Sequence, residues 1–368
     1  MELTIDESIL KSYGLNNQNI KIQQIGSGHI NRTYLLIQTT GEQRKYVLQE
    51  INTHVFTNPA AVANNIKLIA DFLAENFPDY LFPAPVETQT GSTMIEHDGA
   101  FWRLSPFVDN TIALDTLTAP QQAYQAAKQF GKLSRLLDHF DSSKLQETIV
   151  GFHDLHLRFD QFQTALAQGS LSLREQAVKE IETALGFKSI LTEYQALKDS
   201  LPNRVMHHDT KINNVLLAQG SYEGVCVIDL DTLMPGKFIS DLGDMMRTYL
   251  CEFSENETDL SKITVRMDYF AAMIEGYLSE MGDILTETEK KAILFSGKYI
   301  IYMQALRFLA DFLNGSVYYP VNYPLQNLDR TKNQFKLLIQ LVKNEEQLQQ
   351  LISNCLLNSN MKIQKSQN

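Results

Sequence analysis

The chain has 368 residues, of which 44% are hydrophobic and 20% charged; this composition is that of a folded globular protein and excludes a disordered or fibrous chain. Lys and Arg number 32 against 43 Asp and Glu, and the net charge of −11 argues against duplex nucleic acid as a partner, because such a partner needs a basic protein face. The cysteines (Cys226, Cys251 and Cys355) form no Cys-x-x-Cys pair, which indicates a reducing compartment rather than a disulfide framework.

We expect a cytoplasmic protein without a membrane partner. The first ten residues, MELTIDESIL, are acidic and do not have the basic start and apolar run of a signal peptide. The most apolar long segment, residues 298–313, carries Lys298, Arg307 and Asp311. These charges predict a buried core helix rather than a membrane span.

The first hundred residues have the pattern of a small sheet with one helix. In residues 20–53, β-branched and aromatic residues alternate with polar ones, as in strands. Residues 59–76 begin with proline and repeat apolar side chains at helical spacing, and residues 82–107 predict two or three further strands. We therefore expect a β-rich first domain over residues 1–108.

From about residue 119 the pattern becomes helical, with one predicted β-hairpin within residues 205–231. We find no internal repeat. The sequence therefore predicts an α+β fold in which a larger, mainly helical domain, residues 109–368, follows the β-rich one.

The predicted hairpin brings acidic and amide side chains together. If it folds about residues 221–222, Asn214 lies opposite Asp229 at its open end, where cross-strand neighbours are about 5 Å apart. Oxygens of these two kinds are the ligands that Mg²⁺ prefers. Asp209, on the loop leading in, could accept a proton from a substrate hydroxyl, and Lys211 offers a positive charge to a transferring phosphoryl group. An Asp and an Asn at this spacing are also common in ordinary turns, but the apolar strands that flank them favour the metal site.

A glycine turn lies between the first two predicted strands. Gly26, Gly28 and Asn31 form a Gly-x-Gly-x-x-Asn pattern, which by itself is more typical of an ordinary hairpin turn. Without Cβ atoms, the N–H groups of such a turn can also approach the phosphates of a nucleotide. The position of the turn near the N-terminus agrees with a kinase-like arrangement.

These motifs resemble those of the aminoglycoside phosphotransferase family within the protein-kinase-like fold, and more narrowly those of bacterial N-acetylhexosamine 1-kinases. The matching blocks are GSGHINRTYLL (26–36), YVLQEINTHVF (46–56), HHDTKINNVLL (207–217), VIDLDTLMPG (227–236), DLGDMMR (241–247) and RFLADFLNGSVYY (307–319). The resemblance implies a small β-rich lobe, a larger helical lobe, and transfer of a phosphoryl group from ATP to the anomeric hydroxyl of an N-acetylhexosamine.

The resemblance also implies roles for individual residues, in four groups. They are the catalytic residues Asp209 (the base) and Lys211; the Mg²⁺ ligands Asn214 and Asp229; the residues at the ATP phosphates, Gly26, Ser27, Gly28 and Gln49; and the sugar-binding residues His29, Asp209, Arg307 and Tyr318. Adenine is expected near the connector at residues 105–108. The resemblance assigns no oligomeric state.

One departure from the kinase pattern concerns the third strand, which in kinases carries a lysine that binds phosphates and pairs with a helix glutamate. Gln49 stands at that position, and the first half of the following predicted helix has no Glu. The joint loss is physically consistent, because a buried Glu without its Lys would be costly. Lys45 and Lys211 are candidates to replace the lysine. Two alternatives stay open: a kinase for another acceptor (another sugar, an amino alcohol or an aminoglycoside), and a non-catalytic nucleotide-binding protein.

Further expectations concern the surroundings of the hairpin. Asp241 is expected to cap the following helix, and His207 to brace the catalytic loop. Arg307 lies in an apolar helical segment and needs a partner, for which Asp209 or a ligand hydroxyl are candidates. Arg247 is expected to pair with Asp241 or with another acid.

Overall fold

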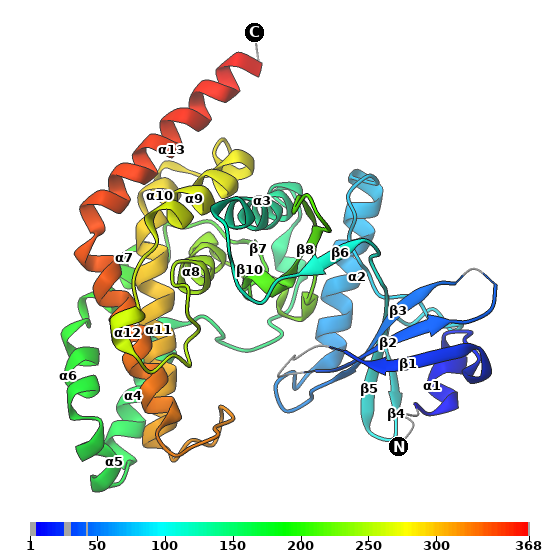
Figure 1. Ribbon diagram of the computed structural model, residues 1–368, viewed down its shortest axis with the longest axis horizontal. Coiled ribbons are helices and arrows are strands. Elements are labelled where there is room, and N and C mark those ends of the chain that lie inside the picture. Colours follow the sequence, from blue (N-terminus) through cyan, green and yellow to red (C-terminus); the bar gives the residue numbers. More distant parts are fainter. Residues whose placement is uncertain (1–4, 26–30, 42, 367–368) are drawn as a thin grey trace.

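An antiparallel sheet organises the first part of the chain in this computed structural model, which describes residues 5–25, 31–41 and 43–366 (Figure 1). The strands lie in the spatial order β1-β2-β3-β5-β4. Their bounds are β1 Ile20–Gln24, β2 Arg32–Gln38, β3 Lys45–Ile51, β4 Ile95–His97 and β5 Ala100–Pro106. On one face of the sheet, Leu36, Leu48 and Leu104 form a small apolar core with the helix α1 (Glu7–Ser12). The predicted strands of this region are confirmed.

The register of β3 and β5 matters for the site. Gln49 stands opposite Arg103, and Leu48 stands opposite Leu104. Because successive side chains of a strand point to opposite faces, Gln49 and Arg103 share the face that does not pack on α1.

The predicted helix is also confirmed and covers this second face. Helix α2 spans Pro59–Asn76, and the Asn58 side chain caps it by accepting a hydrogen bond from the N–H of Ala61 (3.2 Å). Proline fits here because the first N–H groups of a helix have no intrahelical partner. The buried Asn65 side chain donates to the backbone carbonyl of Leu233 (2.9 Å) and so ties α2 to the second lobe.

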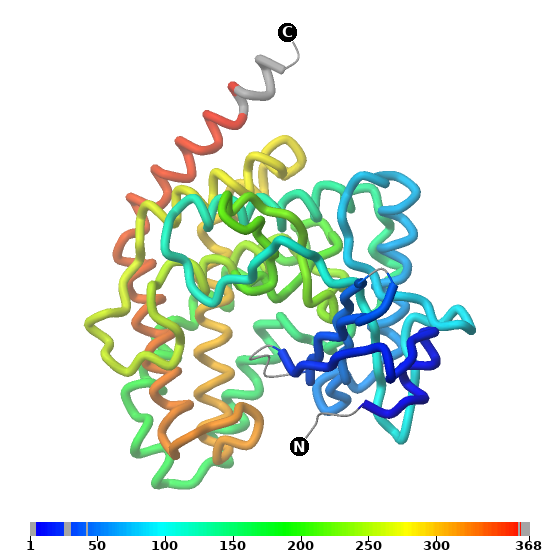
Figure 2. The backbone as a smooth tube through the Cα atoms, turned by 45° about the vertical axis from the view of Figure 1, so that its right-hand side comes forward, coloured from blue at the N-terminus to red at the C-terminus, as the bar shows by residue number. Residues whose placement is uncertain are grey.

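Helices make up most of the rest of the described chain (Figure 2). They are α3 Pro120–Leu136, α4 Leu155–Gln168, α5 Leu171–Gln176, α6 Val178–Gly186, α7 Ser189–Leu197, α8 Phe238–Tyr249, α9 Met267–Met281, α10 Glu287–Lys291, α11 Ile293–Leu313, α12 Gln326–Lys343 and α13 Glu345–Ser366. Short 3₁₀ turns in this part are η2 Ser142–Lys144, η3 Ile212–Asn214, η4 Leu230–Thr232 and η5 Leu260–Lys262, and a further one, η1 Asn17–Asn19, precedes β1. Helix α11 runs through the centre of this lobe and is buried along nearly its whole length, as its apolar sequence predicts. No helix in the described residues is both long and apolar enough to cross a bilayer.

Short strands inside the helical lobe carry the predicted hairpin. β8 (Val215–Ala218) pairs with β9 (Gly224–Val227) and with β6 (Thr111–Ala113), and β7 (Arg204–Met206) pairs with β10 (Met234–Gly236). The predicted register is wrong by one residue. Val215 stands opposite Val227, so the backbone of Asn214 meets Ile228, whose N–H donates to the Asn214 carbonyl (2.9 Å), instead of Asp229. The cause is the turn: Leu217 stands opposite Gly224, so the hairpin folds about residues 220–221 rather than 221–222, and the irregularity between Leu216 and Leu217 recovers one residue of the difference toward the open end.

Candidate active site

The loop after β7 carries the first predicted site residues, and Asp241 holds it in place. The Asp241 carboxylate accepts hydrogen bonds from the backbone N–H groups of His207 (2.9 Å) and His208 (2.7 Å), and the Thr210 hydroxyl donates to the Asp241 carbonyl (2.7 Å). These bonds hold His208 at a left-handed φ of +65°, which is strained for a residue with a Cβ. The predicted helix cap is wrong, because α8 begins at Phe238 and Asp241 lies inside it, with its carboxylate engaged by the loop.

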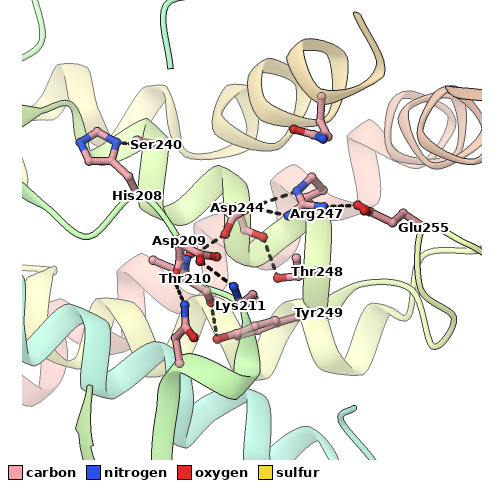
Figure 3. A network of polar contacts seen from close by, with 12 residues as sticks. His208, Asp209, Thr210, Lys211, Ser240, Asp244, Arg247, Thr248, Tyr249 and Glu255 are labelled. Carbon is pink, nitrogen blue, oxygen red and sulfur yellow. Dashed lines mark hydrogen bonds and ion pairs between the residues drawn. The ribbon is translucent and has the colours of Figure 1, made fainter. Parts of the chain in front are cut away.

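Asp209 and Lys211 form the charged pair at the centre of the site (Figure 3). The Nζ atom of Lys211 lies 2.6 Å from Oδ2 of Asp209 and 4.0 Å from Oδ2 of Asp229. Burial acts to raise the pKa of Asp209, but Lys211, with smaller contributions from His207 and Arg247, holds that pKa below its usual value. Asp209 is therefore ionised at neutral pH and can accept a hydrogen bond from a hydroxyl group.

Asn214 lies directly before β8 and Asp229 lies two residues after β9, so both stand at the open end of the hairpin. Nδ2 of Asn214 donates to the backbone carbonyl of Asp209 (2.9 Å), which leaves the amide oxygen as the atom available to a cation. Burial, together with the negative charges of Asp231 and Asp209, raises the pKa of Asp229 to about 7. A cation beside Asp229 would relieve this repulsion between carboxylates.

The donor set fits Mg²⁺. Among the described residues, no three His, Cys, Asp or Glu side chains gather into a metal cluster of their own. A cation at Asn214 and Asp229 would therefore take its remaining ligands from water and phosphate, and Mg²⁺ is bound in this way in phosphoryl-transfer sites.

A second chain of charges reaches the loop from α8, and our sequence analysis missed its central residue, Asp244 (Figure 3). One Asp244 oxygen accepts from the N–H of Thr210 (2.8 Å), and the other accepts from Nε of Arg247 (3.0 Å). Arg247 also donates to Glu255 (3.0 Å), so its partners are Asp244 and Glu255 rather than Asp241. The spacing of three residues between Asp244 and Arg247 on one helix was the available signal.

Arg307 lies on α11 among aromatic rings. Its guanidinium carbon is 5.3 Å from the ring centre of Phe152, 6.0 Å from that of Tyr318 and 5.5 Å from that of Tyr319. The guanidinium group donates to Oε1 of Gln304 (3.1 Å). In the described part of the chain it forms no ion pair with Asp209, which was one of the two candidate partners, and a ligand hydroxyl stays the other.

Asp311 shapes the loop that carries the two tyrosines. Its carboxylate accepts from the backbone N–H groups of Val317 (3.0 Å), Tyr318 (2.9 Å) and Tyr319 (3.0 Å) and from Nδ2 of Asn327 (2.8 Å). Tyr318 is 57% exposed. Our sequence analysis treated Asp311 only as a charge in an apolar helix, because its partners lie beyond the helix end. Since these donors satisfy its carboxylate, Asp311 is not available to an amine.

Phe152 and two histidines connect this aromatic cluster to the loop after β7 that carries Asp209. Phe152 stacks on His153 with ring centres 4.3 Å apart and meets His208 edge-on at 6.4 Å. Both histidines contact the Ser240 hydroxyl through Nδ1. Burial lowers the pKa of His208 to about 4 and also lowers that of His153, so both rings are neutral and add no positive charge to this cluster.

The sheet lobe meets the hairpin through Arg103 and Asp231. Arg103 forms an ion pair with Oδ1 of Asp231, and these side chains are only 4% and 1% exposed. The Arg103 guanidinium also donates to Oε1 of Gln49 (2.7 Å), and Nδ2 of Asn31 donates to Oδ2 of Asp231 (2.6 Å). These contacts join Gln49 of β3, Arg103 of β5 and Asn31 to the segment that carries Asp229.

Other residues expected at the nucleotide divide into those the structure places elsewhere and those it does not describe. Lys45 lies at the opposite end of β3 from Gln49, where it pairs with Asp109 (2.5 Å), so it does not replace the missing lysine. Gly26, Ser27, Gly28 and His29 lie outside the described residues.

A profile of the phosphotransferase enzyme family matches residues 21–270 of the chain. Among solved structures, the chain is similar to an aminoglycoside phosphotransferase from Alicyclobacillus acidocaldarius (13% identity, TM-score 0.61, 95% of this chain and 98% of that one covered). It is also similar to a microcompartment-associated aminopropanol kinase (14%, 0.62, 93% and 97%) and to spectinomycin phosphotransferase in complex with ADP and spectinomycin (13%, 0.57, 92% and 97%). The predicted protein-kinase-like α+β fold, with a small sheet lobe and a larger helical lobe, is confirmed.

Proposed function

Because this chain belongs to the phosphotransferase enzyme family, we propose that it transfers the γ-phosphoryl group of ATP to the anomeric hydroxyl of an N-acetylhexosamine. The observation that carries the proposal is the convergence of Asp209, Lys211, Asn214 and Asp229 at the open end of one hairpin. Phosphoryl transfer uses a general base, a positive charge near the phosphates and side-chain oxygens that can coordinate Mg²⁺.

The chemical step uses the charged pair directly. The acceptor oxygen attacks the γ-phosphorus, the bond from that phosphorus to the β–γ bridging oxygen breaks, and ADP leaves with that electron pair. Asp209, kept ionised by Lys211 at 2.6 Å, takes the hydroxyl proton. Lys211 offsets negative charge as it develops beside Asp209 and Asp229.

We propose Asn214 and Asp229 as the residues that hold Mg²⁺. When bound there, the ion would neutralise and align the phosphate oxygens of ATP. The raised pKa of Asp229, which burial and the neighbouring carboxylates produce, supports this assignment because a bound cation would stabilise the ionised form of Asp229.

We further propose that residues 1–108 form the nucleotide-binding lobe and residues 109–368 the catalytic and sugar-binding lobe. The boundary is supported by the strands, since β5 ends at Pro106 and the next strand, β6, already pairs with β8. The glycine turn at residues 26–28 would cover the phosphates, and the backbone at residues 105–108 would bind adenine.

The charges around the aromatic cluster favour a neutral acceptor over an amine. Arg307 and Arg158 lie close enough that burial, followed by the positive charge of Arg307, lowers the pKa of Arg158 to about 10. The nearby carboxylates of Glu255 and Asp311 are already engaged by Arg247 and by backbone amides. A cationic amino alcohol or aminoglycoside would be repelled there, whereas the hydroxyl and acetamide oxygens of a sugar can accept hydrogen bonds from arginine and tyrosine.

The test is an acceptor panel with ATP and Mg²⁺, in which ADP release is measured and the product is identified by ³¹P NMR. We expect turnover with N-acetylhexosamines, an anomeric phosphate as product, and no turnover with the matching 1-O-methyl glycosides, whose anomeric oxygen is blocked. Turnover of the methyl glycosides, or of amines alone, would contradict the proposed acceptor. ATP binding without turnover of any acceptor would support the non-catalytic alternative instead.

A further inference from the structure

We propose that Arg103 supplies the phosphate-binding cation of the nucleotide site, in place of the third-strand lysine that this chain lacks. The inference rests on the proposed function, because it assigns a contact to the nucleotide of that reaction. It extends that function by naming a phosphate-binding residue on β5 that the sequence did not indicate.

The sheet register puts Arg103 where the lysine would reach. Gln49 occupies the lysine position on β3, and Arg103 stands directly opposite it on β5. Both side chains share the face turned away from α1, and they touch through a 2.7 Å hydrogen bond from the guanidinium group to Oε1 of Gln49. A long side chain on the neighbouring strand can therefore deliver a positive charge to the space that the shorter Gln49 leaves.

Asp231 takes the part that the helix glutamate plays in kinases. It lies two residues after Asp229, and its carboxylate forms an ion pair with Arg103 and accepts a hydrogen bond from Asn31 (2.6 Å). The Arg103 guanidinium group is thus held by the segment that carries Asp229, the expected metal ligand, instead of by α2. This explains why α2 can do without a glutamate in its first half.

One hydrogen-bond donor of the Arg103 guanidinium group, Nε–H, is unpaired among the described residues. The residue is 3% exposed, and its Nε–H group has no hydrogen-bond partner among the described residues. A buried, charged N–H group without an acceptor is unfavourable, and native structures seldom keep one without a reason. Gln49 and Asp231 hold the other side of the guanidinium group, so a phosphate oxygen is a fitting acceptor for the remaining donors.

The experiment compares the dissociation constants of MgADP and adenosine, measured by calorimetry or by competition with a labelled nucleotide. In Arg103→Gln we expect the MgADP constant to rise about tenfold or more, as for the loss of a charge-assisted hydrogen bond, while the adenosine constant changes less than about twofold. Arg32→Gln is the matched control, because Arg32 lies in the same sheet but is exposed and pairs with Glu50, so the ratio of the two constants should stay at the wild-type value.

Asp231→Asn separates phosphate binding from a purely structural role. It breaks the same ion pair but keeps the guanidinium group, so the preference for MgADP over adenosine should be kept or increased. The double variant Arg103→Gln, Asp231→Asn leaves no unpaired buried charge, and it should show the same lost preference if Arg103→Gln alone folds poorly.

The outcomes distinguish this inference from the proposed function. If the wild-type protein binds neither MgADP nor MgATP, the proposed function fails and the inference fails with it. If the wild-type protein binds MgADP but the Arg103→Gln and double variants keep the wild-type ratio of constants, only the inference is overturned. Equal losses of ADP preference in Arg103→Gln and Asp231→Asn would also overturn it, because they would show that only the ion pair matters.

Discussion

Lys211 donates a 2.6 Å hydrogen bond to Asp209, and the same nitrogen lies 4.0 Å from Asp229, so one ammonium group stands between the expected base and an expected metal ligand. This relationship keeps Asp209 ionised despite its burial. In the proposed mechanism, Asp209 on one side of Lys211 would accept the proton, and Asp229 on the other side would hold the metal ion that binds the phosphates.

The first prediction concerns the base. Asp209→Asn removes the proton acceptor but keeps the size of the side chain and the backbone carbonyl that Asn214 contacts. We expect kcat to fall about 100-fold or more, while the MgADP dissociation constant and the unfolding temperature change little. Steady-state kinetics and calorimetry check this. Near-native turnover in the variant would remove Asp209 from the mechanism.

The second prediction concerns pH. Lys211 lowers the pKa of Asp209, and protonated Asp209 cannot accept the hydroxyl proton. Activity is therefore lost as the pH falls through that pKa, and Lys211→Gln should raise the pKa and move the acid limb of the kcat/KM profile to higher pH. Lys211→Arg keeps the charge and should leave the limb nearer its wild-type position. An unmoved limb in Lys211→Gln would show that another group controls it.

The third prediction concerns the brace of the catalytic loop. Asp241→Ala leaves the buried N–H groups of His207 and His208 without their acceptor, at a cost of about 1–3 kcal/mol for each unsatisfied donor. Denaturant unfolding should show this loss of stability. We also expect kcat to fall, because Asp209 is the next residue after His208 and its position depends on the same loop. Asp160→Ala, at an exposed position of α4, should change stability by less than about 0.5 kcal/mol. An equal effect of the two substitutions would argue against a brace.

The fourth prediction concerns the acceptor. Arg307→Gln removes the cation held among the rings of Phe152, Tyr318 and Tyr319. We expect the KM for the sugar to rise about tenfold, as for one lost charged hydrogen bond, while the KM for ATP stays unchanged as an internal control. The KM for amino alcohols should fall, because the positive charge that repels them is removed. A rise in the KM for ATP alone would place Arg307 at the nucleotide instead.

Much of the fold could be predicted because its signals are local. The strands of residues 20–53, the helix opening at Pro59 and the buried helix over residues 298–313 follow from periodicity and turn residues within each segment. The hairpin was also predicted, but its register was wrong by one residue because the polar segment between its strands does not fix which residues lie at the centre of the turn.

The site was predictable where its residues are close in sequence. Asp209, Lys211 and Asn214 lie within one short loop, so their proximity is nearly guaranteed. Arg103 and Asp231 are 128 residues apart and meet only when the two lobes pack, so no spacing rule could pair them. Asp241 was misread for a similar reason, since its acceptor role depends on a loop more than 30 residues earlier.

The most direct test of the account is a crystal structure of the Asp209→Asn variant with Mg²⁺, ATP and an N-acetylhexosamine. We expect the metal on the amide oxygen of Asn214 and the carboxylate of Asp229, with the anomeric hydroxyl within hydrogen-bond distance of residue 209. A metal bound away from these two side chains, or an acceptor that presents another hydroxyl to residue 209, would contradict it.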